Sequence, residues 1–111
     1  MNKLFLAATK EETVGLDYFN YTGVGKINAT YNTLRLIHTH KPKIIINYGT
    51  AGAINVALKG IIECTKFYQR DMDVRGLGFE LGETPFDKTK EIVISENGYS
   101  CGTGDSFVNK K

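Results

Sequence analysis

The feature that most constrains the fold is an apolar run, Ile44-Ile45-Ile46, that leads directly into a glycine-rich turn at residues 49–52. Three consecutive isoleucines without polar alternation are typical of a strand buried on both faces, as in the middle of a parallel sheet. We therefore expect this strand at the centre of an α/β fold. The turn Gly49-Thr50-Ala51-Gly52 brings backbone N–H groups and one hydroxyl to the strand's carboxyl end, so it either closes a tight turn or lines a ligand site.

Length, charge and cysteine content limit the class of protein. A chain of 111 residues predicts a single domain, residues 1–111, with a core of its own. Its 14 basic and 12 acidic residues give a net charge of +2, which indicates neither a nucleic acid nor a membrane as partner. Cys64 and Cys101 fit no zinc or disulfide pattern, so we expect buried thiols in the reducing cytoplasm.

The remaining elements follow from periodicity and from turn residues. The apolar run at residues 4–8 is too short for a signal peptide and predicts a first strand, and Glu11 and Glu12 then suit the start of a short helix. The spacing of Ile27, Tyr31, Leu34 and either Ile37 or His38 predicts an amphipathic helix that Lys41-Pro42 ends. A β-type patch at residues 18–22, strands at 61–67, 91–95 and 99–104, and a glycine-broken loop at 68–85 complete the prediction.

Two possible ligand motifs do not satisfy their chemistry. The stretch Gly23-Val24-Gly25-Lys26 lacks the earlier glycine of a phosphate-binding P-loop, because Asn20 stands there, and Ile27 replaces the hydroxyl residue after the lysine. His38 and His40 are two positions apart, so they do not share a helix face and are expected to be surface residues. We therefore predict no cofactor and no metal site.

Five stretches in order over almost the whole chain carry a resemblance to a known family. They are Ala8-Thr9-Lys10-Glu11-Glu12 and residues 23–29, 45–52, 71–82 and 104–109. Together they resemble the nucleoside phosphorylase superfamily, and most closely its 5′-methylthioadenosine/S-adenosylhomocysteine nucleosidases. The resemblance implies an α/β fold, a nucleoside phosphorylase-like three-layer sandwich with a central mixed β-sheet. It also implies hydrolysis of a purine N-glycosidic bond, as in purine and methionine salvage.

The resemblance assigns roles to residues at the strand ends and near the C-terminus. Glu12 matches the carboxylate that activates water, whereas Glu11 remains a helix-start residue. Thr50 matches a serine whose hydroxyl contacts the sugar and the water. Phe107, which alone would be expected in the core, matches the aromatic residue that stacks on adenine, and the main chain of Val108 matches the contact to the base edge. Further residues implied in substrate binding are Ala8, Ala51 and Gly52.

The resemblance also implies a homodimer around a small-molecule purine nucleoside. In these nucleosidases the glycine-broken loop covers the partner's pocket for the 5′-substituent, at positions matched by Val74, Leu77, Phe79 and Pro85. Leu77 and Phe79 replace larger or more polar aromatic residues, so the preferred 5′-substituent is left open.

Two departures and two alternatives accompany this interpretation. A helix usual in larger members is absent before Gly102, and the ribose-binding Met-Glu segment and the aspartate that protonates the purine would lie beyond Lys111. The resemblance thus implies a chain that is truncated at its C-terminus. Such a chain is expected to be inactive alone because it lacks the acid that protonates the purine, and Asp105 does not replace this acid, since it matches a structural aspartate of the family. The alternatives are a phosphate-dependent purine nucleoside phosphorylase and a non-catalytic chain that only binds nucleoside or dimerises. Asn47 stands where the phosphorylases carry an arginine, which favours water over phosphate.

Overall fold

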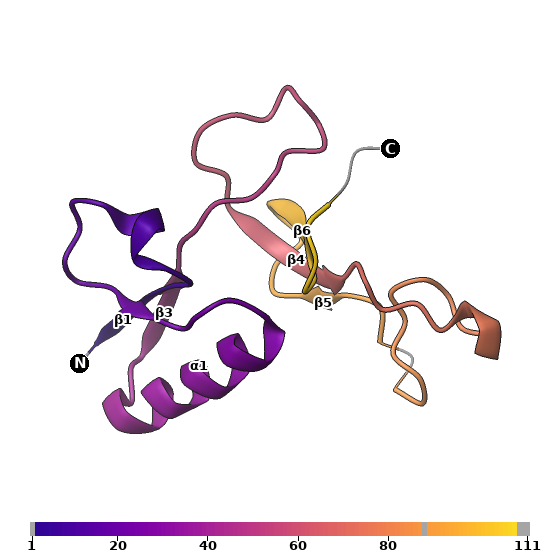
Figure 1. The fold of residues 1–111 in the computed structure, drawn as a ribbon, viewed down its shortest axis with the longest axis horizontal. Coiled ribbons are helices and arrows are strands. Elements are labelled where there is room, and N and C mark those ends of the chain that lie inside the picture. The colour runs from indigo at the N-terminus through magenta and orange to yellow at the C-terminus, as the bar shows by residue number, and fades with distance from the viewer. Residues whose placement is uncertain (1, 88, 109–111) are drawn as a thin grey trace. The chain divides into compact units, whose positions relative to one another are not determined.

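The chain folds into two compact units, each with its own three-stranded sheet. The computed structural model describes residues 2–87 and 89–108. The N-terminal unit comprises residues 1–52 and the C-terminal unit residues 53–111, and Figure 1 labels α1, β1 and β3 of the first and β4, β5 and β6 of the second. The expectation of a single domain over residues 1–111 stays a prediction.

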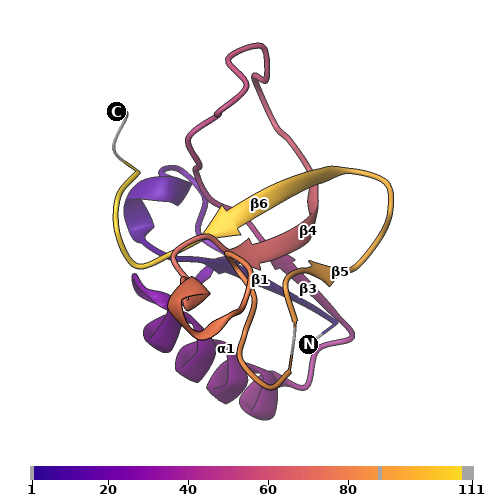
Figure 2. The ribbon, with the colours of Figure 1, turned by 90° about the vertical axis from the view of Figure 1, so that its right-hand side faces the viewer.

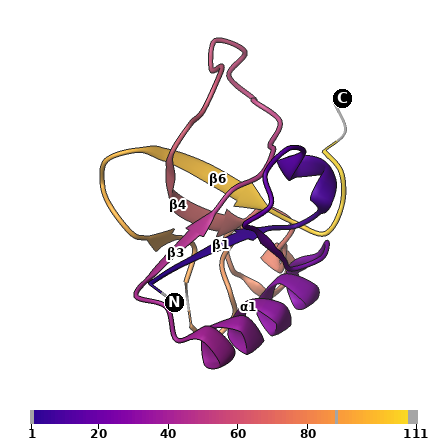
Figure 3. The same ribbon diagram turned by 90° about the vertical axis from the view of Figure 1, so that its left-hand side faces the viewer.

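The N-terminal unit is a small parallel α/β layer. Its strands are β1 (Lys3–Ala7), β2 (Asn20–Tyr21) and β3 (Ile44–Asn47), arranged in the order β2-β1-β3 with both pairings parallel. A 3₁₀ helix, η1 (Lys10–Thr13), follows β1, and the helix α1 (Lys26–His40) connects β2 to β3. Figure 3 shows α1 running beside β1 and β3. The predicted first strand, short helix and crossover helix are therefore confirmed.

Strand β1 is covered on both faces and forms the centre of this unit. Leu4 and Leu6 are buried in a cluster with Leu36 of α1. Phe5 lies on the opposite face because successive side chains of a strand alternate. There its ring contacts an aromatic cluster, with centroids 4.9 Å from Tyr18 and 5.6 Å from Phe19.

Strand β3 is an edge strand, so the prediction that it lies at the centre, buried on both faces, was wrong. It pairs with β1 alone among the described strands, in a register that runs from Lys3↔Ile44 to Leu6↔Asn47. The side chains of Ile44, Ile45 and Ile46 are 48%, 42% and 36% exposed. An apolar run indicates that a strand can be buried, but it does not indicate which of two neighbouring apolar strands is the central one.

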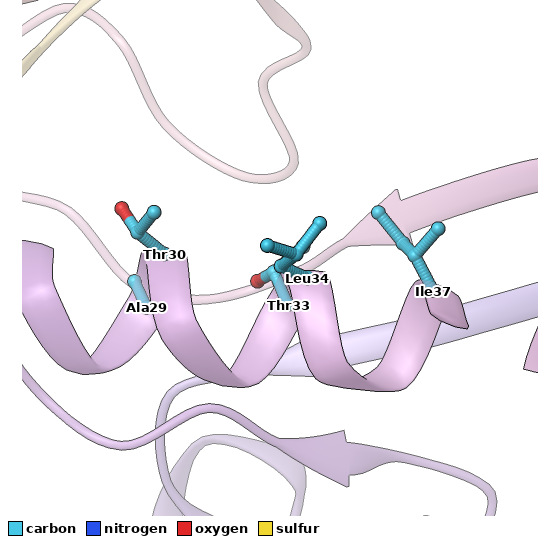
Figure 4. A pocket seen from close by; sticks show the side chains of 5 residues that line it. All are labelled: Ala29, Thr30, Thr33, Leu34 and Ile37. Carbon is cyan, nitrogen blue, oxygen red and sulfur yellow. The ribbon is translucent and has the colours of Figure 1, made fainter. Parts of the chain in front are cut away.

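Helix α1 has the predicted extent, but of the predicted stripe only Ile37, which is partly buried, packs against the core cluster. Lys41 ends it in the left-handed conformation and donates its N–H to the carbonyl of Ile37 at 2.8 Å. Leu36 is the buried residue, whereas Ile27 is 82% exposed and Tyr31 and Leu34 are exposed as well. A shallow apolar depression on α1, shown in Figure 4, is lined by Ala29, Thr30, Thr33, Leu34 and Ile37. In the described part of the chain, no helix has the length and apolar character needed to cross a membrane.

The C-terminal unit is built on a mixed sheet with β4 in the middle. Strand β4 (Cys64–Gln69) pairs with β5 (Ile92–Val93) in antiparallel orientation and with β6 (Tyr99–Thr103) in parallel orientation, and Figure 2 shows β4 beside β6. Strand β4 begins three residues later than the predicted strand at 61–67 and ends two residues later. The predicted loop contains only a short 3₁₀ helix, η2 (Arg75–Leu77). Cys64 and Cys101 are free thiols, but they are half-buried and not fully buried as expected.

We expect Leu4→Ala to destabilise the N-terminal unit by about 2–5 kcal/mol, because it leaves a cavity between β1 and α1. The exposed helix position serves as the control, since Ile27→Ala should change the free energy of unfolding by less than about 0.5 kcal/mol. Urea unfolding followed by far-ultraviolet circular dichroism measures both. Equal losses would mean that the Ile27 face of α1 is covered in solution.

Candidate functional site

The candidate site lies where β1 and β3 end at the same edge of the N-terminal sheet. These strands are parallel and adjacent, so the residues after their carboxyl ends are brought together. The pairing continues past the end of β3, because the N–H of Tyr48 donates to the carbonyl of Leu6 in β1 at 2.8 Å. The segment after β1 then supplies Glu12, and the segment after β3 supplies Thr50.

The carboxylate of Glu12 joins the two segments through four hydrogen bonds. Its Oε1 accepts from the backbone N–H groups of Ala8 at 3.2 Å and Thr9 at 3.3 Å. Its Oε2 accepts from the backbone N–H and from the hydroxyl of Thr50, each at 2.9 Å. A carboxylate has about four acceptor positions, so all of them are in use.

These hydrogen bonds keep Glu12 ionised. Partial burial raises the pKa of the Glu12 carboxyl, but the hydrogen bonds from the Thr50 backbone, the Thr50 hydroxyl, Thr9 and Ala8 together lower it by more. The resulting pKa lies below the ordinary value of 4.5. Glu12 is therefore a carboxylate at neutral pH and can accept a proton.

Gly49 allows the turn after β3 to approach this carboxylate. A β-carbon at position 49 would lie 3.0 Å from Oε2 of Glu12, closer than carbon and oxygen normally pack. A side chain there would push the carboxylate away from Thr50. Gly52 differs, since a β-carbon there would meet nothing within 4 Å in the described part of the chain. The first glycine of the turn is thus explained by the Glu12 contact, and the second is not.

Glu12 is also the helix-start residue that the sequence suggested. Thr9 is the residue before η1, and the bond from its N–H to Glu12 satisfies one of the donors that a helix start leaves unpaired. The structural and the catalytic interpretations of Glu12 are therefore compatible. Glu11, by contrast, has an exposed side chain.

Sequence reasoning missed the residues whose side chains pack beside the segments that carry Glu12 and Thr50. The hydroxyls of Thr13 and Tyr21 lie 2.6 Å apart and join η1 to β2. Tyr48, directly before Gly49, has its ring centroid 5.8 Å from that of Phe19. The aromatic residues in the β-type patch at residues 18–22 suggested that this segment packs against others, but the sequence did not indicate which residues they would contact.

The remaining predicted site residues divide between the two units. Ala51 and Gly52 follow Thr50 in the N-terminal unit and are exposed. Phe107 and Val108 belong to the C-terminal unit, where Phe107 is 95% exposed, so the alternative that it is a core aromatic is wrong. The loop residues of that unit show one exposed side chain, Leu77, and three half-buried ones: Val74, Phe79 and Pro85. Asn109, the last residue of the fifth matching stretch, lies outside the described residues.

Within residues 2–87 and 89–108, no three histidine, cysteine, aspartate or glutamate side chains are grouped so that they could hold a metal ion. Asp105 donates its backbone N–H to Oδ2 of Asp71 at 2.9 Å. This contact uses the backbone of Asp105, so the structural role that the resemblance implied for its side chain stays a prediction.

Comparison with known proteins gives concordant results. The profile of a family described as "Phosphorylase superfamily" matches residues 19–102, well over half of the chain. The 5′-methylthioadenosine/S-adenosylhomocysteine nucleosidase of Exiguobacterium sp. is 36% identical over 107 residues, covering 79% of this chain and 46% of that protein. The chain thus spans about half the length of the curated relatives it matches.

Two solved structures share the fold of the chain. The 5′-methylthioadenosine/S-adenosyl homocysteine nucleosidase of Campylobacter jejuni matches with a TM-score of 0.77 and 22% identity, over 99% of this chain and 67% of that one. The native futalosine hydrolase of Helicobacter pylori matches with a TM-score of 0.75 and 22% identity, over 99% of this chain and 69% of that one. The predicted nucleoside phosphorylase-like α/β fold is confirmed by these likenesses.

We expect Thr50→Val to raise the pKa of Glu12 toward 4.5, because it removes the hydroxyl bond to Oε2 and keeps the side chain's shape. Thr50→Ser keeps a hydroxyl and should leave the pKa low. Carboxyl ¹³C chemical shifts of Glu12, followed over a pH titration, measure both.

The same titration has a consequence for stability. The pKa of Glu12 is lower in the folded than in the unfolded state, so its contribution to stability is fully present above the unfolded pKa. That contribution is lost as the pH falls through the folded pKa, and in Glu12→Gln it should be absent at every pH. Identical titrations of wild type and Thr50→Val would contradict the hydrogen-bond explanation.

Proposed function

The chain belongs to the phosphorylase superfamily, and we propose that it acts as a purine nucleosidase on nucleosides of the 5′-methylthioadenosine/S-adenosylhomocysteine type. The observation that carries this proposal is the ionised Glu12, held against Thr50 at the carboxyl edge of a parallel sheet. The name of the Exiguobacterium relative supports the choice of substrate class.

Glu12 acts as the general base in this proposal. A water between the carboxylate and the anomeric carbon gives its proton to Glu12 while its oxygen bonds to that carbon. The N-glycosidic bond breaks through an oxocarbenium-like sugar, and the purine leaves with a proton from a separate acid. A carboxylate that is already ionised at neutral pH is in the state that this step needs.

All four acceptor positions of the Glu12 carboxylate are occupied, so the attacking water must replace one of the existing hydrogen bonds to Glu12. Three of the four donors to Glu12 are backbone N–H groups whose directions are fixed by β1, η1 and the turn after β3. The fourth is the Thr50 hydroxyl, whose hydrogen rotates freely. We expect this hydroxyl to turn toward the sugar or the water when substrate binds, which gives Thr50 both a resting and a bound role.

Phe107 and Val108 provide the proposed contact to the purine. The exposed ring of Phe107 is available for stacking on adenine, which adds about 0.5–1.5 kcal/mol beyond burial. The main chain of Val108 would bind the edge of the base. Ala8, Ala51 and Gly52 complete the proposed substrate contacts as close backbone near Thr50.

The proposal includes a homodimer in the cytoplasm, where the enzyme would serve purine and methionine salvage. Leu77 is exposed on the loop around η2, and Val74, Phe79 and Pro85 are partly exposed with it. Such apolar side chains suit a pocket for a 5′-substituent across a subunit interface. Two free thiols, Cys64 and Cys101, are in keeping with a reducing compartment.

The arginines favour hydrolysis over phosphorolysis. The sequence has only Arg35, Arg70 and Arg75, and a buried phosphate needs charged donors. Arg35 lies on α1 with a bond to Asn32, Arg75 is paired with Asp73, and Arg70 donates to the Ser106 carbonyl. Asn47 ends β3 where an arginine would be needed.

We expect adenine release from methylthioadenosine to require no phosphate and to yield the free sugar. Because the chain spans about half of its relatives' length, the assay uses the whole gene product. Product analysis with and without phosphate by mass spectrometry decides the reaction. A sugar 1-phosphate product would show a phosphorylase instead.

We expect Glu12→Gln to retain nucleoside binding and to lower kcat by about 10²–10⁴, since an amide cannot take the proton from water. Glu11→Gln is the matched control on the neighbouring exposed residue and should change kcat little. Steady-state kinetics and calorimetric binding measure the two quantities. Equal losses at both positions would leave Glu12 with only its helix-start role.

A further inference from the structure

We infer that Arg70 and Asp71, at the end of β4, form a clamp that positions the segment carrying Phe107 and Val108 for the purine. The inference rests on the proposed function for its ligand, a purine base. It assigns the two side chains as positioning residues, because each has a hydrogen bond to the backbone of the segment.

Arg70 holds the segment through both its main chain and its side chain. The pairing of β4 with β6 runs to Gln69↔Thr103, and the N–H of Arg70 extends it by donating to the Thr103 carbonyl at 2.9 Å. The Nη2 of Arg70 then donates to the carbonyl of Ser106. The guanidinium therefore secures the residue directly before Phe107.

Gly104 makes this contact possible. A β-carbon at position 104 would lie 2.9 Å from Cζ of Arg70 and 3.1 Å from its Nη2. Since the guanidinium is the end of a flexible side chain, it could move aside, but it would then lose the Ser106 carbonyl. A glycine at this position suits the close approach of Arg70 to the segment.

Asp71 secures the neighbouring residue. Its Oδ2 accepts a hydrogen bond from the backbone N–H of Asp105 at 2.9 Å. The two residues that directly follow β4, Arg70 and Asp71, thus bind the consecutive residues Ser106 and Asp105. Two anchored residues in a row fix the direction in which the chain enters Phe107.

The clamp matters because Phe107 has little packing of its own. With 95% of its surface exposed, the position of its ring follows from the path of the backbone before it. A loosened segment would have to be ordered when the base binds, which costs about a tenfold loss of affinity for each residue ordered. Stacking and a main-chain bond to the base edge both depend on that order.

The first test measures the segment without ligand, on the whole gene product. Backbone ¹⁵N order parameters of Phe107 and Val108 should fall below about 0.6 in Arg70→Gln and in Asp71→Ala. Asp71→Asn keeps an acceptor oxygen and should preserve the wild-type order. Arg35→Gln on α1 and Asp87→Ala in the exposed loop remove the same charges elsewhere and serve as controls.

The second test measures the consequence for the substrate, on the whole gene product. The clamp variants should raise KM for methylthioadenosine by about tenfold or more while kcat changes much less, because Glu12 is untouched. Unchanged order parameters and an unchanged KM in both clamp variants would overturn the inference. If the wild-type protein binds no purine, the proposed function fails, and the clamp is then judged by the order parameters alone.

Discussion

The hydrogen bonds between Glu12 and Thr50 are the constraint on which the N-terminal unit's edge depends. They join segments that are 38 residues apart in sequence, after β1 and after β3. The parallel pairing of these strands brings the segments near each other, and the carboxylate then fixes their separation through both of its oxygens. Gly49 contributes by having no side chain where Oε2 must lie. The contact between Glu12 and Thr50 thus has two parts to play: it stabilises the local fold, and it is the basis for interpreting this edge of the sheet as a functional site.

The local elements of this fold could be predicted from the sequence. Residues 26–40 form the expected helix, because Lys41-Pro42 ends the periodic pattern, and β6 falls within the expected strand. The resemblance named Glu12 and Thr50 separately as site residues, and the structure brings them into contact because the carboxyl ends of parallel strands meet at one edge. Sequence patterns were sufficient for those elements whose structure depends on residues close to them in the sequence.

The sequence was a poorer guide to which surfaces are covered. The run Ile44-Ile45-Ile46 suggested a central strand, but the strand that contains Leu4, Phe5 and Leu6 occupies the central position. On α1, the spacing of Ile27 with Tyr31 described an exposed stripe, whereas Leu36 contacts the sheet. Burial depends on partners distant in sequence, which periodicity does not identify. For the same reason the bonds of Arg70 and Asp71 to the segment 104–106 left no pattern in the sequence.

The order β2-β1-β3 has a consequence for how the site comes into being during folding. Strand β3 can pair with β1 only after the chain between residues 3 and 44, with the whole of α1, has closed into a loop. Such long-range parallel pairing is slow, because the entropy of closure is lost before the contacts form. Glu12 and Thr50 meet only beyond the far end of that pairing. The carboxylate therefore gains its Thr50 partners in one of the late folding events, whereas its bonds from Ala8 and Thr9 are local, so that a chain with an ordered helix α1 but an unpaired β3 has only half of the Glu12 contacts.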